Sequence, residues 1–151
     1  MNLFPFQLSA LSFELIYDRP NRPNRGNKNM EKKEKHTVLI IEDDPDVLAT
    51  LTKNVAYFGY EVITATDGLE GMRKLEDGGY DLVITDIVMP YVSGVGVVAR
   101  LKEKNPEIPV IVITGYGKEP EEAAMEKNAD LVLTKPVKIN ILRDHISKLI
   151  S

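Results

Sequence analysis

The chain has 151 residues, of which 43% are hydrophobic and 28% charged, and its formal net charge is −4. This composition predicts a soluble globular domain, and the absence of cysteine excludes disulfides, thiolate nucleophiles and cysteine-bound zinc. No apolar stretch approaches the roughly 20 residues of a membrane span. Residues 36–151 carry a net charge of −7, which argues against nonspecific binding to nucleic acid and suits a protein that concentrates divalent cations.

Residues 1–35 differ in character from the rest of the chain, because their net charge is +3. The stretch 18–29 is rich in Pro, Asn and Arg, a composition that does not bury enough apolar surface to fold. We therefore predict that residues 1–35 are a disordered N-terminal extension and that residues 36–151 form the folded domain. Met30 resembles a natural start, so residues 1–29 are interpreted as a tail or as an upstream extension of the start site.

Strand and helix patterns alternate from residue 36 onward. Five short apolar runs, rich in β-branched residues, lie at 37–41, 61–65, 82–85, 109–113 and 130–134. Runs that are apolar on both faces are typical of buried parallel strands. Amphipathic helical patterns lie between and after them, for example Leu69, Met72 and Leu75, and the helix containing these residues has a capping Asp67 before it. The pattern predicts a (βα)₅ chain, hence an α/β fold with a five-stranded, doubly wound parallel sheet.

Polar side chains follow three of these runs directly. The first run leads into the acidic cluster of Glu42, Asp43 and Asp44, the third into Asp86, and the fifth into Lys135. Open α/β sheets place their ligands at the carboxyl ends of the strands, so these groups should meet at one edge. Such a set can hold a divalent cation and a phosphoryl group.

Each of these residues also has a purely structural interpretation. The acidic cluster can cap the helix that follows it, and Asp44 suits that role by itself. Asp86 can be an ordinary loop acid, Thr114 before a glycine can belong to a turn, and Lys135 can be a solvated charge. Their joint occurrence at strand ends favours the functional interpretation.

Four segments that surround these residues resemble the signatures of response-regulator receiver domains of two-component signalling. They are VLIIEDDPDV, DLVITDIVMP, VIVITG and LVLTKP, at residues 38–47, 81–90, 110–115 and 131–136. The resemblance covers about residues 36–150, and the four segments occur in order with suitable spacing. It implies the flavodoxin-like strand order 2-1-3-4-5 for the sheet.

The resemblance also implies a role for each site residue. Asp86 is the expected phosphoacceptor, Thr114 the switch hydroxyl, and Lys135 the fixed positive charge beside the phosphoryl group. The expected Mg²⁺ ligands are Asp43, Asp86, the backbone carbonyl of Val88 and, through water, Glu42. The side chains at Val88 and Tyr116 are expected to set the lifetime of the phosphorylated state.

The function implied is that of a stand-alone cytoplasmic receiver. A histidine kinase or histidine phosphotransfer protein would supply the phosphoryl group. A downstream protein would then read the face formed by the fourth helix, fifth strand and fifth helix. The chain ends with that helix, so we expect no DNA-binding output, no membrane span and no catalysis on an outside substrate. The sequence leaves open a monomer or a dimer through the same face.

Two other functions are compatible with this fold. The first is a constitutive docking module that works without phosphorylation, although such proteins usually lack the acceptor, the lysine or the acidic pair. The second is a Mg²⁺-dependent phosphatase with an aspartyl nucleophile. Those enzymes usually carry a second Asp two residues after the nucleophile, and Val88 occupies that position here.

Overall fold

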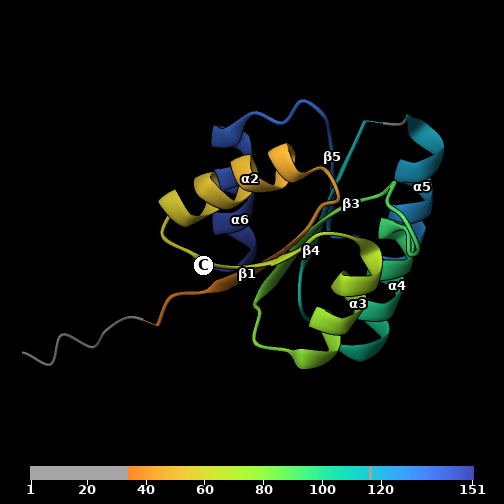
Figure 1. The fold of residues 1–151 in the computed structure, drawn as a ribbon, viewed down its shortest axis with the longest axis horizontal. Helices are drawn as coiled ribbons and strands as arrows, with labels where there is room; N and C mark the ends of the chain where they lie inside the picture. Colours follow the sequence, from red (N-terminus) through yellow and green to blue (C-terminus); the bar gives the residue numbers. More distant parts are fainter. Residues whose placement is uncertain (1–33, 116) are drawn as a thin grey trace, which may run out of the picture. The chain divides into compact units, whose positions relative to one another are not determined.

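Five parallel strands alternate with five helices in the computed structural model, which describes residues 34–115 and 117–151 (Figure 1). The strands are β1 (Thr37–Ile41), β2 (Glu61–Ala65), β3 (Leu82–Asp86), β4 (Val110–Thr114) and β5 (Leu131–Thr134). The helices are α2 (Pro45–Tyr57), α3 (Gly68–Asp77), α4 (Gly94–Lys104), α5 (Lys118–Glu126) and α6 (Ile139–Leu149). The predicted disordered extension stays a prediction, because residues 1–33 lie outside the described residues.

The sheet has the strand order β2-β1-β3-β4-β5, with every pair parallel, which confirms the predicted topology. Helices α2 and α6 cover one face, and α3, α4 and α5 cover the other (Figure 1). Each face of the sheet carries its own hydrophobic core, and alternate residues of β1 point into one or the other. Leu39 packs in the core under α3, α4 and α5, and Val38 packs in the core under α2 and α6. Both faces of the sheet are therefore buried, as the apolar runs predicted. None of the helices in the described ranges has the length and hydrophobicity of a membrane span.

Two helices begin with an aspartate cap, as expected from the sequence. Asp44 Oδ1 accepts the backbone N–H of Asp46 at 2.9 Å and that of Val47 at 3.2 Å, which caps α2. Asp67 accepts the N–H of Glu70 at 2.8 Å and caps α3. These bonds satisfy helix N–H groups that have no partner within the helix. Asp44 thus holds the structural role that the sequence suggested.

One predicted helix face is wrong in detail. Leu69 was expected to point inward with Met72 and Leu75, but it is 47% exposed, whereas Leu75 is completely buried. The buried positions at the start of α3 belong to Gly68 and Gly71 instead. A Cβ on Gly71 would lie 2.7 Å from Cδ1 of Ile41, so α3 packs on the sheet more closely than a leucine would allow.

Candidate functional site

The predicted site residues lie at the carboxyl edge of the sheet. Glu42 follows β1, Asp86 ends β3, Thr114 ends β4, and Lys135 follows β5. The registers place Asp86 opposite Ile113 and Thr114 opposite Thr134, so the ends of β3, β4 and β5 lie side by side. The order of the strands therefore brings together residues that are far apart in the sequence, as parallel doubly wound sheets do.

Lys135 makes the central contacts of this site. Its Nζ lies 3.1 Å from Oδ2 of Asp86 and 3.4 Å from Oε2 of Glu42. The Asp86 and Glu42 side chains are 5% and 2% exposed, whereas that of Lys135 is 30% exposed. Carboxylate oxygens of Glu42, Asp43 and Asp86 all lie within 4.8 Å of one another. One ammonium group thus faces two buried carboxylates, with a third close by.

A cavity of about 490 Å³ opens over these groups. It is lined by Glu42, Asp43, Asp44, Asp86, Val88, Met89, Pro90 and Lys135. Most of the predicted phosphorylation and metal residues therefore share one cavity. Thr114 is not among the lining residues, although it ends the strand next to Asp86 and is completely buried. Tyr116 lies outside the described residues.

Burial and neighbouring charges shift the pKa values of two groups in this site. Burial raises the pKa of Glu42, and the charge of Asp86 raises it further, against a hydrogen bond from the N–H of Asp44 and the attraction of Lys135. Burial alone would lower the pKa of Lys135, but its hydrogen bonds and attraction to Asp86 and Glu42 outweigh that effect and raise it. The acidic cluster is thus short of positive charge, and the lysine is held protonated.

The backbone around Asp86 is also fixed. Asp86 Oδ1 accepts the N–H of Ile87 at 2.7 Å, which leaves Oδ2 directed at Lys135. The loop residues Met89 and Pro90 line the cavity, and the sequence reasoning did not identify them as part of it. Met89 and Pro90 directly follow Val88, a predicted ligand, and this position in the sequence could have identified them.

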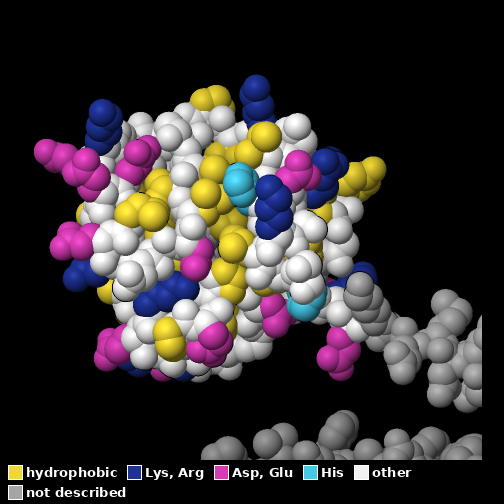
Figure 2. All heavy atoms as spheres, turned by 180° about the vertical axis from the view of Figure 1, so that it is seen from behind, with side chains coloured by type: hydrophobic (Ala, Val, Ile, Leu, Met, Phe, Trp, Pro, Cys, Tyr) yellow, Lys and Arg dark blue, Asp and Glu magenta, His cyan; other side chains and the backbone are white. Residues whose placement is uncertain are grey.

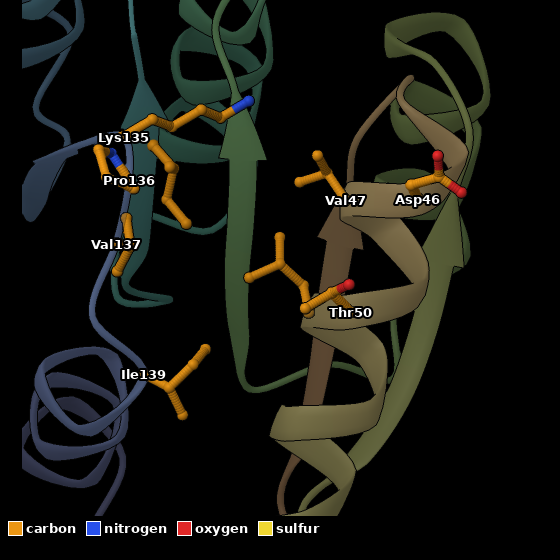
Figure 3. A pocket seen from close by; sticks show the side chains of 9 residues that line it. Asp46, Val47, Thr50, Lys135, Pro136, Val137 and Ile139 are labelled. Atoms are coloured by element: carbon orange, nitrogen blue, oxygen red, sulfur yellow. The ribbon is translucent and has the colours of Figure 1, made fainter.

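A second, more apolar cavity of about 570 Å³ lies beside the first. Lys135, Pro136 and Val137 form one side, and Val47 and Thr50 on α2 form the other (Figure 3). Figure 2 shows how hydrophobic side chains gather along the middle of one face of the molecule, between charged groups of both signs. Lys135 lines both cavities, so the two are neighbours that share this lysine.

A doubly wound parallel sheet with acidic groups and a lysine at its carboxyl edge is the arrangement that the four sequence segments led us to expect of a receiver domain. The family model for the response regulator receiver domain matches residues 38–147, and the chain belongs to this family. It is thus a receiver domain of the kind that two-component systems use. The resemblance seen in the four sequence segments is confirmed.

Individual relatives agree with this assignment. The chain is 33% identical over 117 residues to the sensor protein EvgS of Escherichia coli K12, covering 77% of this chain and 10% of EvgS. It is 38% identical over 100 residues to the transcriptional regulatory protein PrrA of Mycobacterium tuberculosis, covering 66% of this chain and 43% of PrrA. The chain therefore spans less than half the length of these two relatives.

Solved structures show the same fold. A CheY-like receiver domain protein of Methanospirillum hungatei superposes with a TM-score of 0.74 at 29% identity, over 77% of this chain and 94% of that one. The response regulator TrrA of Thermotoga maritima, solved in complex with Mg²⁺ and BeF, superposes with a TM-score of 0.70 at 31% identity. That alignment covers 76% of this chain and 98% of TrrA.

Proposed function

We propose that this receiver domain accepts a phosphoryl group on Asp86 in a Mg²⁺-dependent reaction. The observation that carries this proposal is the contact of Lys135 Nζ with both Asp86 and Glu42, at 3.1 and 3.4 Å, inside a cavity that is also lined by Asp43 and Asp44. The phosphoryl donor is a histidine kinase or a histidine phosphotransfer protein. The complex of TrrA with Mg²⁺ and BeF supports a cation at such a site by analogy.

Apart from a proton from water, the transfer needs only the phosphohistidine of the donor and the carboxylate of Asp86. A carboxylate oxygen of Asp86 attacks the phosphorus of the phosphohistidine, the new O–P bond forms, and the P–N bond breaks. The electron pair of the broken bond stays on the imidazole nitrogen, which takes up a proton from water. Lys135, already 3.1 Å from Asp86, is placed to bind the oxygens of the incoming phosphoryl group.

The residues present fit a magnesium ion. Glu42, Asp43 and Asp86 offer hard carboxylate oxygens within 4.8 Å of one another, and Val88 lines the same cavity. Mg²⁺ prefers one or two carboxylates together with water and phosphate oxygens. Asp43, Asp86 and the Val88 carbonyl would hold the ion directly, and Glu42 through water. When bound, the ion neutralises charge between the carboxylates and the phosphoryl group.

The decisive test is incubation with acetyl phosphate and Mg²⁺, followed by intact-mass measurement. A gain of one phosphoryl group that is lost on omission of Mg²⁺ supports the proposal. A protein that binds its partners but never acquires phosphate would instead be a constitutive docking module. Turnover of p-nitrophenyl phosphate distinguishes the phosphatase alternative, and we expect it to be negligible because no second Asp follows Asp86 at position 88.

Removal of Asp43 should weaken Mg²⁺ binding. We expect Asp43→Ala to raise the Mg²⁺ dissociation constant at least about tenfold, because it deletes a carboxylate of a site with few protein ligands. Titration followed by amide chemical shifts measures this change. Asp46→Ala is the matched control, since Asp46 is an exposed acid at the start of α2 that does not belong to the cluster. Equal affinity in Asp43→Ala and the parent would contradict the metal assignment.

The phosphorylated state should be long-lived, with a lifetime of minutes or more. Val88 is 48% exposed beside the cavity and has no group that can orient an attacking water. Tyr116 is bulky enough to shield the phosphoryl group, by analogy with the family. The double variant Val88→Asn, Tyr116→Glu should therefore lose phosphate faster, because a positioned water reacts far more readily. Loss of the phosphoryl mass over time measures both rates, and a parent lifetime of seconds would contradict this prediction.

The face formed by α5, β5 and α6 is the proposed output surface. Phosphorylation of Asp86 would change it through Thr114, which ends the strand between β3 and β5. A downstream protein, rather than nucleic acid, is the proposed reader of this face, and the cytoplasm is the proposed location.

A further inference from the structure

A hydrogen bond joins the two ends of the loop that connects β3 to α4. Gly94, the first residue of α4, donates its N–H to the carbonyl of Ile87 at 2.7 Å. A Cβ on Gly94 would overlap the carbonyl oxygen of Asp86. Helix α4 thus begins directly against the backbone of the proposed phosphoacceptor. This end of the loop has no room in which to move.

The middle of the loop adopts a strained conformation. The N–H of Val92 donates to the carbonyl of Pro90 at 2.9 Å, and Tyr91 between them has a φ of +70°. This is the geometry of a classic γ-turn, which is rare and unfavourable for a residue other than glycine. The Tyr91 side chain is 81% exposed, so packing of its ring does not hold the turn in place. Other contacts must impose this conformation.

One close contact at the end of this turn comes from helix α3. Gly68, the first residue of α3, is buried, and a Cβ built on it would overlap the carbonyl oxygen of Val92 and lie 2.9 Å from the Val92 Cβ. Gly68 does not have a positive φ, so its backbone conformation does not require glycine. The close approach to Val92 is the reason that a side chain is excluded at this position.

We propose that Gly68 is a positioning residue for the Mg²⁺ site. Because Gly68 has no side chain, α3 can pack directly against the Val92 carbonyl. This contact holds the loop in the position at which the Val88 carbonyl faces the acidic cavity. The inference rests on the proposed function, which assigns that carbonyl to the metal. Gly68 does not line the cavity, so it acts only through the loop.

A side chain at position 68 would have to displace backbone. Movement toward α4 is blocked, because Gly94 already lies against Asp86. Movement of α3 away from the loop is opposed by the burial of its Leu75 in the core that α3 shares with the sheet. A side chain at position 68 would therefore displace loop residues 88–91, which include the proposed metal ligand, the Val88 carbonyl.

The experiment compares Gly68→Ala with the parent protein in two measurements. Amide chemical shifts of Val88 and Met89 without Mg²⁺ report the loop directly. The rate of phosphorylation by acetyl phosphate, measured as a function of Mg²⁺ concentration, separates metal affinity from the rate at saturation. We expect the half-saturating Mg²⁺ concentration to rise about 10- to 100-fold, the range seen when groups that orient metal ligands are removed. The rate at saturating Mg²⁺ should fall much less.

Two controls isolate the backbone contact. Gly96→Ala places a Cβ 3.1 Å from Cγ1 of the same Val92, a side-chain atom that can yield, so it should bind Mg²⁺ like the parent. Leu75→Ala removes a completely buried side chain farther along α3 and lowers stability without adding a group against the Val92 carbonyl. If Leu75→Ala weakens Mg²⁺ binding as much as Gly68→Ala does, the role of Gly68 is only structural and the inference is wrong.

The outcomes distinguish this inference from the proposed function. A parent protein that takes neither Mg²⁺ nor phosphate overturns the proposed function. A parent that takes both, together with a Gly68→Ala variant of unchanged Mg²⁺ dependence, overturns the inference alone. If Gly68→Ala does not fold, Val92→Gly replaces it, because glycine gives the backbone at this contact more freedom to leave its place against Gly68. Unchanged Mg²⁺ affinity and unchanged Val88 shifts in that variant would likewise overturn the role assigned to this contact.

Discussion

Asp86→Asn should abolish phosphorylation by acetyl phosphate while it preserves the fold. The amide of Asn is a far poorer nucleophile than a carboxylate, and no other carboxylate in the cavity contacts Lys135 except Glu42. The Asn Oδ1 can still accept the N–H of Ile87, which Asp86 now accepts at 2.7 Å, so the local backbone should be retained. Intact-mass measurement after incubation with Mg²⁺ and acetyl phosphate checks the result. Phosphate uptake that survives the substitution would place the acceptor at another residue.

The same variant should be more stable than the parent in Mg²⁺-free buffer. Three carboxylates lie close together and one ammonium group contacts two of them, so removal of one negative charge relieves their repulsion. Lys135 keeps its contact with Glu42, so the gain should be on the order of 1 kcal/mol. Chemical denaturation measures it. Asp46→Asn is the matched control, because this exposed acid in the first turn of α2 lies outside the cluster and should give no gain.

The fold was largely predictable, because strands and helices leave short, periodic patterns of apolar residues in the sequence. Each predicted strand agrees with the structure to within one residue, since short runs that are apolar on both faces have few other solutions. That the proposed metal and phosphoryl ligands gather at one edge of the sheet was predictable for a related reason. Glu42, Asp86 and Lys135 follow strand ends, and parallel topology alone brings strand ends to one edge.

The contacts that hold the site were not predictable from periodicity. The hydrophobic pattern assigned Leu69 to the core, but the close approach of α3 depends on Gly68 and Gly71, which carry no hydrophobic signal. The positive φ of Tyr91 is equally invisible, because tyrosine is not a residue that marks such turns. These features depend on distances between segments that are far apart in the chain, which only the structure supplies.

Lys135→Ala should have two separable effects, one on stability and one on reactivity. In the described part of the chain, the ion pairs of Glu42 and Asp86 are both with Lys135, so the variant leaves two buried carboxylates without a positively charged partner. Loss of one member of a buried pair costs about 3–5 kcal/mol, and about 2 kcal/mol is expected here because Lys135 is 30% exposed. Saturating Mg²⁺ should restore part of that stability, since it supplies the missing positive charge.

The rate of phosphorylation should remain low in Lys135→Ala even when Mg²⁺ restores its stability. The lysine is proposed to stabilise charge on the phosphoryl oxygens, and loss of such a group lowers rates about 100- to 1000-fold. Lys138→Ala is the control, because Lys138 is exposed at the start of α6 and should leave the rate unchanged. Thr114→Ala should behave differently: it should accept phosphate but lose most of the phosphorylation-induced amide shifts on α5, β5 and α6. If Mg²⁺ restores both the stability and the rate of Lys135→Ala, the lysine only balances charge and has no role in the transfer itself.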